Sequence, residues 1–86
     1  MFAYIIICRT LTEAERINRM LNASGISAKI VRVPAYIARE GCAFGVGCNS
    51  MESIVLQRAL ERNGIRNRVY FSQSGMRYAM LGGDRR

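Results

Sequence analysis

The first half of the chain carries the hydrophobic pattern of a strand followed by a helix. Residues 2–7 form a continuous apolar run that is rich in β-branched and aromatic side chains, which is typical of a strand buried on both faces. A helix is predicted next, beginning at Thr12 with Glu15 as its capping box. Thr10 with Glu13 gives an alternative start. The apolar residues that follow repeat at helical spacing: Ala14, Ile17, Met20 and Leu21.

A second strand is predicted over residues 26–33. Gly25 ends the preceding helix, in the left-handed conformation that glycine favours. Lys29 and Arg32 lie within the strand, and charged side chains there indicate an exposed edge of a sheet. Pro34 ends the strand because proline has no N–H to donate to the ladder.

The second half of the chain repeats the order strand, helix, strand. After a loop over residues 34–41, a short third strand is predicted over residues 42–47 and a fourth over residues 66–72. The helix between them is expected to be capped at Asn49 or Ser50. Its predicted apolar face consists of Met51, Ile54, Val55, Ala59 and Leu60.

A repeated motif links the two halves. Both predicted helices close on Leu-x-x-x-Gly-Ile, at residues 21–26 and 60–65. Two successive strand-helix-strand units predict an α+β fold, the ferredoxin-like split βαβ sandwich with the order β-α-β-β-α-β. Right-handed crossovers place the third strand between the first and second in a four-stranded antiparallel sheet, with both helices on one face. The other face is expected to be open for binding or dimerisation.

The length of the chain limits the number of domains, and its charge indicates the kind of partner. A chain of 86 residues, half of them hydrophobic, suits one small domain. We expect that domain over residues 1–75, followed by a basic C-terminal tail over residues 76–86. The formal net charge of +7 favours anionic partners without identifying one.

The apolar runs and the cysteine count indicate the compartment. The longest apolar run is far shorter than the roughly 18 residues that cross a bilayer, and it lacks the flanks of a signal peptide. Three cysteines are an odd number, which suits a reducing compartment better than a disulfide framework. We therefore expect a cytoplasmic protein without membrane association.

Histidine is absent from the sequence. This excludes histidine-based acid–base catalysis, a Ser-His-Asp triad and zinc sites that need imidazole. The cysteines have no C-x-x-C spacing, so no metal site and no cofactor is expected.

The three cysteines are the reactive side chains that stand out. In an extended strand Cys42 and Cys48 lie about 20 Å apart, too far for a disulfide within one molecule. Cys8 ends the first strand and Cys42 opens the third. Because these two strands are expected to be antiparallel neighbours, the two sulfurs are predicted to lie at the same end of the sheet, where they can approach each other.

Cys42 is the first candidate for a functional thiol. Gly41 beside it permits close approach of a partner, and Arg39 is placed to stabilise a thiolate or persulfide anion. Cys48 is a possible second thiol, because a helix N-terminus after it lowers the pKa of a cysteine. Cys8 is interpreted as a packing residue of the core.

The chain resembles a family of small bacterial single-domain proteins described as selenium/sulfur carrier-like. The resemblance covers roughly residues 2–71 and rests on the opening strand, the Leu-x-x-x-Gly-Ile motif, the Val33-Pro34 junction and a cysteine eight residues after that proline. The family's Pro-Arg and Cys-Gly pairs are replaced here by Pro34-Ala35 and Cys42-Ala43.

The resemblance implies a thiol-based carrier. Cys42 would accept sulfur or selenium as a persulfide or selenosulfide and pass it to a partner. The partners would be donor and acceptor proteins or small thiols. Such a protein acts as a carrier or binding protein rather than as an enzyme with turnover.

Two alternatives come from the residues. In an RNA- or anion-binding module, the open sheet face would bind the ligand, with Tyr4 and Phe44 as a base-stacking pair. In a structural homodimer, Gly45 and Gly47 would permit close contact between the sheets of two copies.

Overall fold

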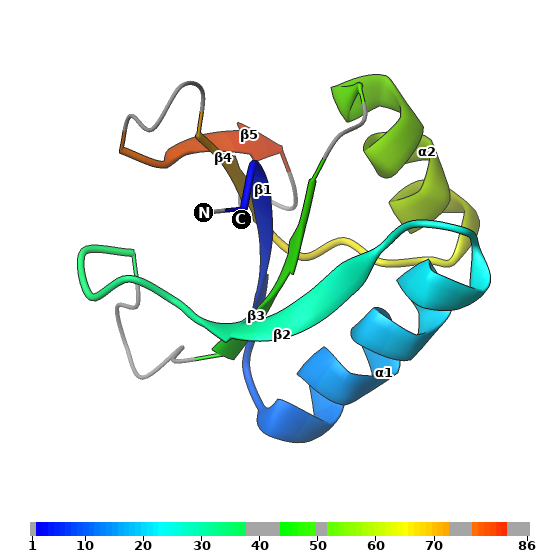
Figure 1. Ribbon diagram of the computed structural model, residues 1–86, viewed down its shortest axis with the longest axis horizontal. Helices are drawn as coiled ribbons and strands as arrows, with labels where there is room; N and C mark the ends of the chain where they lie inside the picture. The colour runs from blue at the N-terminus through cyan, green and yellow to red at the C-terminus, as the bar shows by residue number, and fades with distance from the viewer. Residues whose placement is uncertain (1, 38–43, 50–51, 73–76, 83–86) are drawn as a thin grey trace.

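The computed structural model describes residues 2–37, 44–49, 52–72 and 77–82. Within these ranges the chain forms an α+β fold with two helices and a five-stranded antiparallel sheet (Figure 1). The elements are β1 (Tyr4–Cys8), α1 (Leu11–Ala23), β2 (Ala28–Arg32), β3 (Phe44–Cys48), α2 (Ser53–Arg62), β4 (Val69–Phe71) and β5 (Ala79–Gly82). Each predicted strand overlaps an observed one and is shifted or shortened by a few residues.

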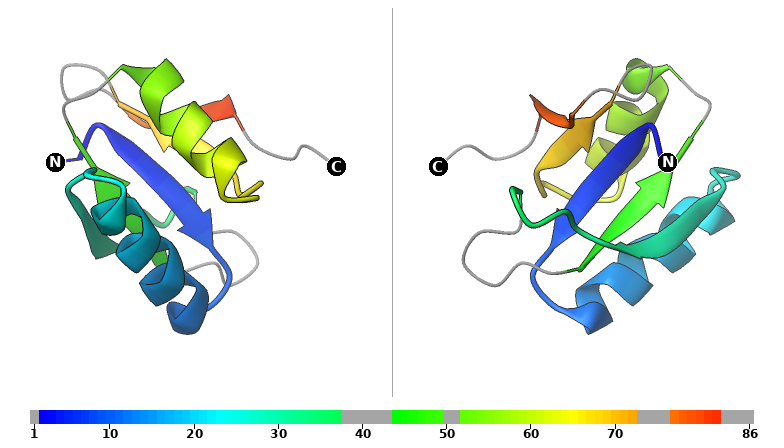
Figure 2. Two further views of the ribbon diagram at one scale, coloured as in Figure 1. Left: turned by 90° about the vertical axis from the view of Figure 1, so that its right-hand side faces the viewer. Right: turned by 60° about the vertical axis from the view of Figure 1, so that its left-hand side comes forward.

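The sheet has the order β2-β3-β1-β4-β5. In the register of β1 against β3, Tyr4 lies opposite Cys48 and Cys8 lies opposite Phe44. The predicted insertion of the third strand between the first and second is therefore confirmed. Figure 2 shows both helices on the same side of the sheet, as the two crossovers require.

The predicted number of four strands is wrong, because β5 adds a fifth. β5 lies within residues 76–86, which the sequence analysis expected to be a tail. It pairs antiparallel with β4, with Phe71 opposite Ala79 and Tyr70 opposite Met80. A segment this short carries no periodicity that would identify it as a strand.

The first helix begins in the alternative register. The Thr10 hydroxyl accepts a hydrogen bond from the N–H of Glu13 at 3.1 Å, and the Glu13 carboxylate accepts one from the N–H of Arg9 at 2.8 Å. The expected start at Thr12 is therefore wrong. Gly25 follows the helix with a φ of +85°, as predicted for a residue after a helix end.

The second helix begins later than predicted. Its N-cap is Glu52, which makes no capping hydrogen bond through its side chain. Asn49, expected as a cap, accepts a hydrogen bond from the N–H of Ala3 at 2.6 Å and so joins the end of β3 to the start of β1. Ser50, the other predicted cap, and Met51, from the predicted apolar face, lie outside the described residues.

The apolar face of α2 also differs from the prediction. Leu56, Ala59 and Leu60 are buried, and their spacing is that of a single stripe along a helix. Ile54 and Val55 were expected on this face, but they are about half exposed, at 49% and 47%. The stripe centred on Leu56 turns both of them toward solvent.

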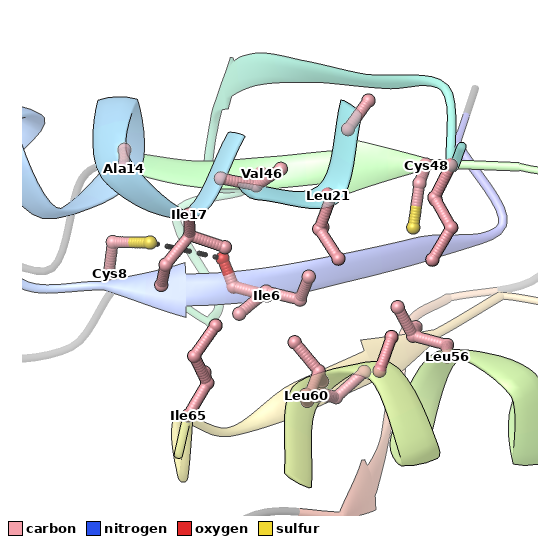
Figure 3. Close-up of a cluster of buried hydrophobic side chains, with 14 residues drawn as sticks. Ile6, Cys8, Ala14, Ile17, Leu21, Val46, Cys48, Leu56, Leu60 and Ile65 are labelled. Carbon is pink, nitrogen blue, oxygen red and sulfur yellow. Dashed lines mark hydrogen bonds between the residues drawn. The ribbon is translucent and has the colours of Figure 1, made fainter. Parts of the chain in front are cut away.

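The main core lies between the sheet and the helices (Figure 3). We call it the helix-side cluster. Its fully enclosed large side chains are Ile6, Ile17, Leu21, Leu56, Val46, Cys8 and Cys48. No helix in the described part of the chain is long and apolar enough to cross a membrane.

The opposite face of the sheet is partly covered, which corrects the expectation of an open face. Ile5 of β1 is buried there with Val33 and Ile37 from the chain after β2. Partly buried side chains pack around them: Ile7, Val31, Tyr70 and Tyr78. We call this set the far-side cluster.

The two glycines of β3 accommodate the chain's own residues. A Cβ atom added at Gly47 would lie 2.6 Å from Cγ of Phe2, and one added at Gly45 would lie 2.8 Å from the carbonyl oxygen of Ile6. Both distances are shorter than real contacts allow. The expected use of these glycines for contact with the sheet of a second copy is therefore wrong.

Candidate functional site

Three of the candidate residues, Arg39, Gly41 and Cys42, lie outside the described residues. They stay predictions from the sequence. The structure describes the chain on either side of them: residues 34–37, where the N–H of the last residue donates to the carbonyl of the first at 2.9 Å, and Phe44, the first residue of β3.

Cys8 lies at the end of the sheet where β3 begins, since it pairs with Phe44. Its side chain is fully buried, and its thiol donates to the carbonyl of Ile6 at 3.6 Å. The interpretation of Cys8 as a packing residue is confirmed. Its predicted approach to Cys42 stays a prediction.

The surroundings of Cys48 raise the pKa of its thiol, whereas the sequence predicted a lowered pKa. Burial in the helix-side cluster raises the pKa of the Cys48 thiol to about 11. The expectation of a lowered pKa is wrong for two reasons. The helix begins at Ser53 rather than directly after the cysteine, and the side chain points into the core, where charge is disfavoured. A buried thiol that stays protonated is a poor nucleophile, which argues against Cys48 as a second functional thiol.

The two described cysteines do not act together. The register places Cys48 opposite Tyr4 and Cys8 opposite Phe44, so they lie at opposite ends of β1, about 13 Å apart along the strand. Figure 3 shows the two sulfurs at opposite ends of the cluster. Both are free thiols, and the distance between them is too long for a disulfide.

The aromatic pair expected to stack on bases lies on the wrong side of the sheet. Tyr4 and Phe44 both pack against the helix-side cluster. The far face, which would be the binding face in such a module, does not present them. The structural basis of the RNA-binding alternative is therefore wrong for these two residues.

A group of contacts on the far face was not predicted from the sequence. The N–H of Tyr78 donates to the hydroxyl of Tyr36 at 2.7 Å, and the Tyr78 hydroxyl donates to the carbonyl of Phe2. The guanidinium of Arg77 lies 4.0 Å from the centre of the Tyr36 ring. Burial and the neighbouring Tyr36 raise the pKa of Tyr78. No periodic pattern in the sequence relates these residues, so nothing in it identifies them.

No three side chains of His, Cys, Asp or Glu lie close enough together to hold a metal ion, in the part of the chain that the structure describes. The described part of the site therefore consists of the two buried thiols, Cys8 and Cys48, and of the described segments that precede and follow Cys42 in the sequence, residues 34–37 and β3.

This arrangement defines a class: a small α+β protein with three cysteines, two of which the core encloses. The family whose model matches residues 3–71 is described as "Putative Se/S carrier protein-like", and the chain belongs to this family. The match covers the chain from β1 to β4 and ends before β5. No curated protein and no solved structure matches the chain.

Proposed function

We propose that the protein is a carrier of sulfur or selenium and that Cys42 is the thiol that holds it. Membership of the Se/S carrier-like family supports the class of function. The burial of Cys8 and Cys48 supports the choice of residue. A buried thiol is hard for a donor to reach, so the burial of these two cysteines favours Cys42, the remaining cysteine of the sequence, and this observation carries the proposal.

The proposed loading step is a thiol exchange without net oxidation. The Cys42 thiolate attacks the outer sulfur of a donor persulfide, R–S–SH. The S–S bond of the donor breaks while a new S–S bond forms to Cys42. The donor thiolate leaves with the electron pair, and the persulfide proton goes to it. Selenium would be held in the same way as a selenosulfide, and delivery to an acceptor is the reverse exchange.

Two neighbours of Cys42 would assist this step. The positive charge of Arg39 would favour the thiolate and the anion of the loaded form. Gly41 has no side chain, so a donor would be able to approach the sulfur closely. The partners would be donor and acceptor proteins or small thiols, and a cytoplasmic, reducing setting would keep the thiol free.

We also infer that the unit formed by β2, β3, β1, β4 and the two helices is a ferredoxin-like sandwich. Its strand order is the one that two split βαβ units produce. β5 is then an addition at one edge of that unit.

The test is to load the reduced protein with a small-molecule persulfide and to record its intact mass. The wild type is expected to gain one sulfur atom that a reductant removes, and Cys42→Ser is expected to gain none. Cys8→Ala and Cys48→Ala serve as matched controls and should load as the wild type does. A sulfur gain that persists in Cys42→Ser would contradict the proposal.

A further inference from the structure

The two long edges of the sheet differ in how they resist pairing with another chain. β2 forms one edge and carries the exposed charges of Lys29 and Arg32. Charged side chains on an edge strand oppose the addition of another strand, because pairing would desolvate them. This edge is therefore protected by its own composition.

β4 has no such protection. Its three residues, Val69–Phe71, are all β-branched or aromatic and carry no formal charge. A strand of this composition at a free edge is a template for pairing with a second chain. In this protein β5 occupies that edge, paired through Tyr70 opposite Met80 and Phe71 opposite Ala79.

The first two residues of β5 bury little side-chain surface. Ala79 is exposed and Met80 is 44% exposed, and the pairing with β4 has a register shift between Val69 and Tyr70. The residues just before β5, Arg77 and Tyr78, add contacts of their own to this pairing.

Tyr78 attaches the start of β5 to the rest of the protein. Its ring packs against the far-side cluster, its hydroxyl donates to the carbonyl of Phe2, and its N–H donates to the hydroxyl of Tyr36. Arg77 adds a cation–π contact with the Tyr36 ring. These contacts tie the start of β5 to the beginning of the chain and to the turn after β2.

We propose that residues 77–82 form a strap that closes the β4 edge against a second copy of this chain. When the tyrosine contacts of the strap are lost, β4 pairs antiparallel with β4 of the second copy in a symmetric dimer. This inference goes beyond the proposed function and does not depend on Cys42.

A second copy suits this edge because β4 is self-complementary. Two antiparallel copies centred on Tyr70 place Arg68 of each opposite Ser72 of the other, so no like charges face each other. A symmetric pairing of this kind closes on itself as a dimer. β5 lies beyond the residues that match the family, so the strap is an element added to the matched unit.

The test compares the full chain with the double variant Tyr36→Phe/Tyr78→Phe by sedimentation equilibrium. Both substitutions keep the rings and remove the two hydroxyls. Loss of two hydrogen bonds is expected to raise the dimer association constant by about tenfold or more. Thr12→Ala is the control, because it removes an exposed hydroxyl from α1 and leaves β4 and the strap unchanged. It should associate as the wild type does.

Two further measurements test the strap: amide hydrogen exchange, and dimerisation when an engineered disulfide holds the strap closed. Amides of residues 78–82 should exchange faster in the double variant. In a Cys42→Ser background, a disulfide between Phe71→Cys and Ala79→Cys should hold the strap closed and return the double variant to a monomer until it is reduced. Released amides without dimerisation, unchanged exchange, aggregates larger than a dimer, or a dimer that survives the lock would each overturn the proposal.

Discussion

Gly47 and Phe2 pack so closely that there is no room for a side chain at position 47. The Phe2 ring lies where a side chain at position 47 would stand, with its Cγ 2.6 Å from the Cβ that an alanine would introduce. The glycine is needed here for the space it leaves, since the φ of Gly47 is not positive. It thereby lets the first residues of the chain lie on β3.

Gly47→Ala is predicted to destabilise the protein by about 1–3 kcal/mol, because overpacking forces Phe2 or the strand to move. The measurement is the free energy of unfolding in urea. Phe2→Ala provides the matched background, since it removes the ring that the new methyl group meets. If the alanine at position 47 destabilises both backgrounds equally, the contact with Phe2 is not the cause.

Cys48 shows how tertiary burial overrides a local signal. A cysteine shortly before a predicted helix suggests an activated thiol, but the position of the side chain between strand and helices raises its pKa to about 11. The sequence does not reveal this, because the facing residues, such as Leu21 and Leu56, come from distant segments. Cys8 was interpreted correctly since burial is the usual state of a free cysteine at the end of an apolar strand.

The raised pKa of Cys48 predicts a loss of stability in alkali. The folded thiol keeps its proton up to about pH 11, whereas the unfolded thiol loses it near 9.0. The folded state therefore binds more protons between these values. The contribution is full below pH 9 and is lost as the pH rises through 11, about 2–3 kcal/mol in all.

Urea unfolding below pH 9 and at about pH 11, compared between the wild type and Cys48→Ala, measures this contribution. The wild type should lose more stability than the variant, because alanine has no proton to release. Equal losses in the two proteins would show that Cys48 is not buried as a neutral thiol.

At the scale of elements, the start of α1 depends on one hydroxyl. Thr10→Ala is predicted to lower the free energy of unfolding by about 1 kcal/mol, because the N–H of Glu13 loses its capping partner. Thr12→Ala is the matched control: Thr12 is exposed within the helix and should change stability little. Thermal or urea unfolding distinguishes the two. A larger effect at Thr12 would contradict the observed start.

The helices illustrate which features of an element the sequence can specify. Both capping boxes near the start of α1 satisfy the same local pattern, so the sequence does not say which of them begins the helix. In α2 the apolar residues exceed what one stripe can bury, and the sequence does not say that Leu56 is enclosed while Ile54 and Val55 are exposed. The existence of both helices was predictable. The buried face of α1 was also predicted correctly, but that of α2 was not.

At the scale of the whole molecule, connection rules predicted most of the sheet. Two right-handed strand-helix-strand units leave few arrangements, and the observed neighbours of β1 and β3 follow from them. β5 escaped prediction because its place depends on Tyr36 and Tyr78, contacts between residues far apart in the sequence. The same holds for the far-side cluster, which covers a face expected to be open.

For the candidate site, too, the sequence and the structure contribute different residues. The choice of Cys42 rests on the sequence and on the family, and that of Arg39 and Gly41 on the sequence alone. The structure contributes the burial of the other two thiols. The sequence left Cys48 as a possible second thiol, and its burial argues against that role. Together these observations make Cys42 the residue on which the carrier proposal depends.

The most direct measurement locates the transferred sulfur. The protein is loaded with a persulfide donor in its folded state, alkylated, digested and mapped by tandem mass spectrometry. The account predicts the added sulfur on the peptide that contains Cys42, with Cys8 and Cys48 unmodified. Added sulfur on either buried cysteine, or on none of the three, would contradict it.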